Sequence, residues 1–222
     1  LGWTAADSGS LHVEAAGFSL EPFDSLARAK LKLEPDSLNF RRLGGTASLR
    51  VDVLGSLEDP AIDGRVEAEQ VQIDDWTLRK LTADVRADSL SSKGIQLDAT
   101  VDSIGKGRQL GTDVHLVVGG SADSLSAAVS GNLRDSRLSL GGWRIAQPDG
   151  DQLGIDSLRL DLPRQQWTLD RPAVLTVTDR IITLSDTMVL STVDGSGLMM
   201  LSGAVPGSGT AELSASVIGL DL

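Results

Sequence analysis

The sequence contains no cysteine and no tyrosine, and aromatic residues make up only 3% of its 222 residues. Without cysteine the chain can form neither disulfides nor thiolate metal sites. Compact cores and protein interfaces usually take much of their buried area from aromatic side chains. Here leucine, valine, isoleucine and alanine must supply that area, so we expect a smooth aliphatic surface.

The chain also lacks an excess of positive charge, since its formal net charge is −11 at pH 7. A nucleic-acid-binding surface needs a cationic patch, and an electrostatic anchor on an anionic membrane needs basic clusters. The densest basic spots, Arg41-Arg42 and Arg79-Lys80, stand between apolar residues. We therefore expect no nucleic-acid partner.

No apolar run approaches the roughly 20 residues that span a bilayer as a helix, and there is no signal-peptide pattern. The chain opens with Leu1-Gly2-Trp3, without an initiator methionine, and stops with Leu220-Asp221-Leu222 inside an alternating segment. We expect residues 1–222 to be one continuous segment of a longer protein.

What the sequence has in abundance is alternation of aliphatic and polar residues, as in residues 49–53, 95–101 and 158–162. A period of two places every second side chain on the same face of a β-strand. Turn residues separate the segments, which predicts an all-β fold: a long, largely antiparallel sheet with one aliphatic face, one polar face and little or no helix. The predicted strands are residues 10–16, 28–34, 46–54, 64–74, 77–88, 94–103, 111–119, 124–131, 136–141, 155–162, 173–178, 181–191, 197–204 and 210–221. Residues 21–30 fit either a one-turn helix or a continued strand.

The residues that could carry chemistry are scattered. His12 and His115 stand at polar positions of alternating segments, and we expect both to face solvent. Glu67 and Glu69 share a strand face beside Arg65, which favours a solvated surface over the facing carboxylates of a glycosidase. No metal-ligand spacing and no Ser-His-Asp arrangement stands out. We expect no enzyme activity, no catalytic residue, no metal site and no cofactor.

Two further features have simple structural interpretations. The glycine-rich residues 105–111 lack the spacing of a phosphate-binding loop, so they predict a hairpin. Gly141-Gly142 predicts a turn. Trp143 and Trp167 stand at segment starts, and we expect them to cover a sheet edge with the indole N–H reaching solvent. A sugar-stacking platform is the alternative.

One local pattern is distinctive. Residues 55–69, "GSLEDPAIDGRVEAE", resemble the G-x-L-x-x-P-x-(I/L/V)-x-G-x-(I/L/V) repeat of TamB-like and AsmA-like envelope proteins. Residues 167–173 followed by 197–203 resemble that family's "W-x-L-x-x-P-A … G-x-L-x-L-x-G" passage, and residues 124–143 resemble its runs before a tryptophan. The resemblance covers about residues 47–222, and the earlier residues match only in their alternation.

The resemblance implies a sheet curled into a trough, a β-taco, in the periplasm between two membranes. Such proteins are proposed to carry phospholipids with acyl chains in the trough and headgroups in water, from the inner to the outer membrane. They are also proposed to support outer-membrane assembly together with an outer-membrane barrel partner. The inner-membrane anchor and the contacts with both membranes would belong to the parent protein.

The alternation is consistent with that role. A two-tailed phospholipid pulled through water exposes some thirty methylenes, at roughly 0.8 kcal/mol each, so about 20–25 kcal/mol. A continuous aliphatic face offsets most of this cost without specific contacts. The candidates for lining a lipid groove are Val51, Val53, Ile95, Leu97, Val101, Val114, Leu116, Leu158, Leu160, Leu184, Leu190 and Leu213. The alternative is that these residues pack against one another in a closed core.

Two other functions remain open at this stage. A surface β-solenoid or sandwich used for adhesion or glycan binding would have a closed aliphatic core and a functional outer face. Irregular segment lengths and the scarcity of aromatic residues count against it. A hydrolase on a β-solenoid lacks an acid–base or nucleophile constellation.

Overall fold

The computed structural model describes residues 9–22, 43–56, 59–88, 94–107, 109–121, 123–148, 150–178, 181–206 and 212–219. Within these ranges most residues lie in β-strands, only residues 21–22 are helical, and the strand pairs whose register is defined are antiparallel. The predicted fold class is confirmed. The chain divides into two compact units, Leu1–His115 and Leu116–Leu222. That the whole chain forms one continuous groove segment stays a prediction.

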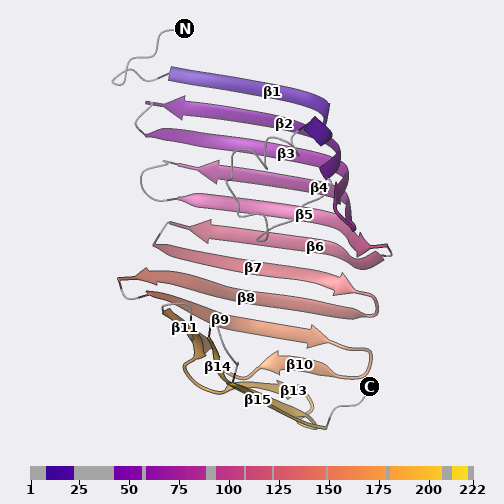
Figure 1. The fold of residues 1–222 in the computed structure, drawn as a ribbon, viewed down its shortest axis with the longest axis vertical. Helices are drawn as coiled ribbons and strands as arrows, with labels where there is room; N and C mark the ends of the chain where they lie inside the picture. Colours follow the sequence, from indigo (N-terminus) through magenta and orange to yellow (C-terminus); the bar gives the residue numbers. More distant parts are fainter. Residues whose placement is uncertain are drawn as a thin grey trace. The chain divides into compact units, whose positions relative to one another are not determined.

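The first unit is a meander in which each strand pairs with the next along the chain. Figure 1 shows its strands lying one beside the other. They are β1 (Gly9–Ser19), β2 (Leu43–Gly55), β3 (Pro60–Ile73), β4 (Trp76–Ala87), β5 (Ile95–Lys106) and the first part of β6 (Gln109–Gly120). The predicted glycine-rich hairpin is present between β5 and β6, where Gly107 has φ +68°.

The register of this meander sorts the side chains by polarity. Directly paired residues of neighbouring strands lie on the same face of a sheet. Val51 pairs with Val13 and with Gly64, and Val53 pairs with Leu11 and Ile62. The rows continue through Val85 and Leu97 and through Ala87 and Ile95. The intervening rows carry the charged residues, so the two faces differ in polarity as predicted.

The alternation is interrupted where β2 and β3 bend. The register shifts between Gly44 and Thr46, and Gly45 has φ +110°, while its neighbour Gln70 has φ +52°. Both φ values are positive and lie in the left-handed half of the Ramachandran plot, which glycine adopts at little cost. The interruption brings Ala47, Ala68 and Val71 into one buried cluster. Ala68 and Val71 are three positions apart, which a regular strand would place on opposite faces.

The second unit begins as a meander and ends in a closed circuit of short strands. The rest of β6, β7 (Ser124–Leu133), β8 (Ser136–Gln147) and β9 (Gly150–Asp161) lie in chain order. β9 pairs with β8 along one edge, and along the other with both β10 (Gln166–Leu169) and β11 (Ala173–Thr178). The pairing runs from β10 through β13 (Met188–Thr192), β14 (Leu198–Pro206) and β12 (Ile181–Leu184) back to β11. β15 (Glu212–Ile218) pairs with β14 outside the circuit.

The circuit buries the side chain of Trp167. This side chain is 1% exposed, on the short strand β10 between Leu160 of β9 and Thr192 of β13. A Cβ at Gly197 would lie 2.7 Å from the indole ring, so the glycine makes room for the ring. The indole Nε1 has no hydrogen-bond partner in the structure. The expectation that Trp167 covers an edge with its N–H in solvent is wrong.

The strand boundaries differ from the predicted ones in instructive places. Residues 173–178 form a strand as predicted, whereas residues 181–191 contain two strands, β12 and β13. β10 was not predicted. Gly141-Gly142 lies inside β8 rather than at its end, because both glycines pair with β7 and β9. The predicted strand 28–34 and residues 23–30 of the helix candidate lie outside the described residues.

The bend between β2 and β3 predicts a sharp difference between two adjacent glycines. A Cβ at Gly45 would lie 2.7 Å from the Gln70 carbonyl oxygen, on a backbone with φ +110°. Gly45→Ala should therefore lower the free energy of unfolding by about 1–3 kcal/mol or more. Gly44→Ala, whose Cβ would meet nothing closer than 3.8 Å, should change it by less than about 0.5 kcal/mol. Urea unfolding of both variants measures this, and equal losses would contradict the argument.

Candidate functional site

The aliphatic face of the first unit is incompletely buried. Leu11 is 48% exposed and Ile95 is 42% exposed, although both belong to the aliphatic rows. The buried apolar residues described in this unit are Ala47, Ala68, Val71 and Ala87. Apart from Val71 these are alanines, so the larger side chains of the rows are left accessible. Such a surface can bind an apolar ligand.

The second unit has a hollow of about 370 Å³ on its aliphatic face. Its lining includes small residues of neighbouring strands, where Ala127 of β7 pairs with Gly142 of β8. Larger aliphatic side chains also line the hollow, namely Leu116, Val118, Leu125, Val129, Leu140 and Leu153.

Trp143 of β8 is a further residue that lines the hollow. Trp143 pairs with Gly154, and a Cβ at Gly154 would lie 2.1 Å from the indole ring, so the ring lies across the glycine. The indole Nε1 donates a hydrogen bond to Asp156 Oδ1 at 3.0 Å. The expectation of a Trp143 at a segment start with its N–H in solvent is wrong, since the residue lies within β8 and its N–H is bound.

The predicted groove residues fall into three groups. The aliphatic face of the first unit carries Val51, Val53, Ile95, Leu97 and Val101. Val114 lies in the part of β6 that belongs to this unit. Leu116 lines the hollow, and Leu158 and Leu160 pair with Leu140 and Leu138 on the same face. Leu184 and Leu190 belong to the closed circuit, where Leu190 is 5% exposed, and Leu213 on β15 is 58% exposed. A role in lipid binding stays a prediction for all of them.

Several lining residues were missed by sequence reasoning. Leu125, Ala127 and Val129 lie in the predicted strand 124–131 and follow its alternation, so they could have been added. Arg144 also lines the hollow, and nothing in the local pattern points to it. Its position depends on the continuation of β8 beyond the two glycines.

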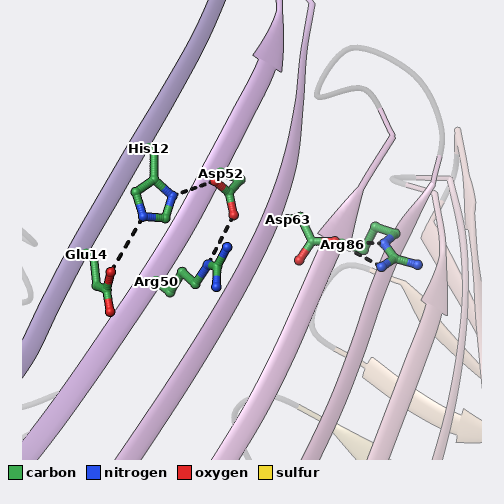
Figure 2. Close-up of polar contacts among 6 residues, drawn as sticks. All are labelled: His12, Glu14, Arg50, Asp52, Asp63 and Arg86. Atoms are coloured by element: carbon green, nitrogen blue, oxygen red, sulfur yellow. Dashed lines mark hydrogen bonds and ion pairs between the residues drawn. The ribbon is translucent and has the colours of Figure 1, made fainter.

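The polar face carries networks of exposed charges (Figure 2). His12 Nδ1 lies 2.6 Å from Asp52 Oδ1, and its Nε2 lies 3.7 Å from Glu14. Arg86 binds Asp63 through two nitrogens, at 2.9 and 3.1 Å. His115 contacts Asp98 at 2.9 Å. Both histidines therefore lie on the polar face, as the alternation predicts.

These networks resemble a solvated surface rather than a catalytic site. Arg65 binds Glu67 at 2.9 Å and Asp84 at 3.1 Å, which agrees with the surface interpretation of Glu67. The hydrogen bond with Asp52 raises the pKa of His12, and the same bond lowers the pKa of Asp52. Within the described ranges no group of three or more His, Asp or Glu could hold a metal ion.

One ion pair lies on the aliphatic face. Arg144 Nε and Nη2 donate to the two carboxylate oxygens of Asp151 at 2.9 and 3.0 Å. The two side chains are 39% and 35% exposed. The hydrogen bond with Asp151 raises the pKa of Arg144. This bidentate pair stands beside the hollow.

Comparison with known protein families identifies the family of this chain. A family model described as "TamB, N-terminal domain" matches residues 13–185. The match covers most of the sequence, so the chain belongs to the TamB N-terminal-domain family. It confirms the resemblance to the family and begins earlier, at Val13, while the part of the resemblance beyond residue 185 lies outside the match. Neither the comparison with curated proteins nor that with solved structures gives a match.

The family indicates a general role. Its members are associated with lipid transport and outer-membrane assembly in the cell envelope, as bridges for lipids rather than as enzymes. They act with lipids and with outer-membrane partners. In the part of the chain that the structure describes, no helix is both long and apolar enough to cross a membrane.

The His12–Asp52 contact predicts a measurable titration. Because the pKa of His12 is raised above 6.5, the contact stabilises the fold below about pH 6.5 and is lost as the pH rises through the folded-state pKa. An NMR titration of the His12 ring should give a midpoint above 6.5, and Asp52→Asn should lower it. Asp84→Asn, which removes a partner of Arg65, is the control. An Asp52→Asn midpoint equal to that of the unchanged chain would refute this role of Asp52.

Proposed function

We propose that this chain shields phospholipid acyl chains along its aliphatic face, with the headgroups in water, during lipid transport from the inner to the outer membrane. The observation that carries the proposal is apolar surface left accessible in each unit, as exposed aliphatic side chains in the first and as the hollow in the second. Membership of the TamB N-terminal-domain family supports it.

The energetics favour a transient rather than a tight complex. Burying one methylene of an acyl chain on an apolar surface stabilises the complex by about 0.8 kcal/mol, so a stretch of several methylenes gains several kcal/mol. The hollow is lined mainly by aliphatic side chains and glycine, with Arg144 as its one charged lining residue, so few polar groups fix a ligand in one orientation. An acyl chain on such a surface can shift along it at little cost, which transport requires.

In this proposal the polar face contacts water and the aliphatic face contacts lipid. The polar face holds exposed ion pairs, such as Arg86–Asp63 and Arg65–Asp84, which favour contact with water. The aliphatic face is then the side on which a lipid gains by leaving water. An inner-membrane anchor and an outer-membrane barrel partner of the parent protein complete the proposal, and both rest on the family.

Site-specific photocrosslinking in growing cells tests the proposal. A photoreactive residue replaces Leu97 or Leu116 on the aliphatic face, and Asp98 or His115 at the adjacent polar positions serves as the matched control. We expect phospholipid adducts at the two leucine positions and not at the controls. Their absence at all four positions would overturn the proposal and favour a closed core. Equal labelling of both faces would mean that contact with lipid is nonspecific.

A further inference from the structure

The hollow in the second unit has one charged residue on its wall. Of the residues that line it, only Arg144 carries a charge, and the rest of the lining is aliphatic, glycine or tryptophan. Arg144 is bound to Asp151. Lipid shielding alone requires neither residue, because a hydrocarbon surface would serve acyl chains better.

The strand register fixes the pair on the side of the hollow. Arg144 pairs directly with Leu125 and with Leu153, both of which line the hollow. Asp151 lies two positions before Leu153 on β9, so the two side chains lie on the same face of the strand. The pair thus stands at one margin of the hollow, next to the residues that would hold an acyl chain.

Both partners keep unused hydrogen-bonding capacity. A guanidinium has five N–H donors and a carboxylate has about four acceptor positions. The mutual contact uses two donors of Arg144 and one position on each oxygen of Asp151. Each side chain is more than a third exposed, so a further group can reach it.

Stability does not explain the pair well. A half-exposed ion pair contributes little to the free energy of folding, and apolar residues of similar volume often replace a poorly solvated pair without loss. The two residues hold opposite charges side by side at a place where the surface otherwise favours hydrocarbon. That arrangement complements a ligand that joins an apolar chain to a group with both charges.

We propose that the Arg144–Asp151 pair receives the headgroup of a zwitterionic phospholipid, with the phosphate beside Arg144, the ammonium beside Asp151 and an acyl chain in the hollow. This inference rests on the proposed function and adds a preference among lipids. An anionic phospholipid offers no cation to Asp151, and the net charge of −11 of the whole chain disfavours it further.

Lipid retention by the purified full-length chain tests the preference. The chain is incubated with vesicles of equal parts phosphatidylethanolamine and phosphatidylglycerol with identical acyl chains, then re-isolated, and its bound lipids are quantified by mass spectrometry. We expect about a two- to five-fold enrichment of phosphatidylethanolamine, the range that partly exposed charge contacts provide. Asp151→Asn leaves Arg144 unpaired and should shift the ratio toward phosphatidylglycerol.

The double variant Arg144→Gln/Asp151→Asn should bring the ratio to about one while the total amount of bound lipid is kept. Arg159→Gln/Asp161→Asn is the matched control, because this pair, at 2.9 Å, lies on the opposite face of β9. It should leave the ratio unchanged. Circular dichroism verifies that each variant is folded.

An unchanged ratio in both Asp151→Asn and the double variant would overturn the inference while leaving acyl-chain shielding intact. A wild-type chain that retains no lipid at all would overturn the proposed function, and the inference with it. The two failures are distinguishable because one is read from the headgroup ratio and the other from the total lipid bound.

Discussion

The structure depends on the rule that directly paired residues of neighbouring antiparallel strands lie on one face. A shift of a single residue in one register would carry an aliphatic row to the polar side. In the first unit the register places Val13, Val51, Gly64, Val85 and Leu97 in one row, and the next row is charged. Contacts between charges on the polar face, such as Arg65 with Asp84, oppose a shift as well, because a shifted strand would lose its partner.

This construction allows an apolar face to stay open. In most small domains side-chain burial holds the layers together, and an uncovered apolar face would be a liability. Here the backbone ladder joins each strand to its neighbours, and few large side chains among the described residues of the first unit are buried. In the closed circuit of the second unit, side-chain burial does contribute, because Trp167, Leu190 and Ala173 are buried there. A single chain thus combines an open surface with a sealed one.

Alternation alone predicted the fold class and the division between faces, because a period of two is a local property. It failed where the outcome depends on distant partners. Gly141-Gly142 has the composition of a turn, yet both residues are held in β8 by pairing on either side. β10 is too short to show a period, and its place between β9 and β13 is set by residues that follow it in the chain.

The candidate site was predictable to a similar extent. Leu116 was found from its strand phase, and Leu125 or Val129 follow from the same rule. The hollow was not predictable, because its lining residues come from β6, β7, β8 and β9, and a local pattern does not show which strands lie side by side. Arg144 was missed because its partner Asp151 lies across a hairpin, and a lone arginine in an alternating segment carries no signal about its neighbours.

The closed circuit has a consequence for the order in which the chain can fold. Each strand of the two meanders finds its partner in the strand just before it, so these pairs can form as the polypeptide emerges. β9 also needs β10 and β11, and the circuit closes only when β14 arrives, some forty residues after β9 ends. Until then, β12 and β13 each have one edge without its partner strand. A delay or a truncation before Leu198 would therefore leave those edges available to other unfolded chains.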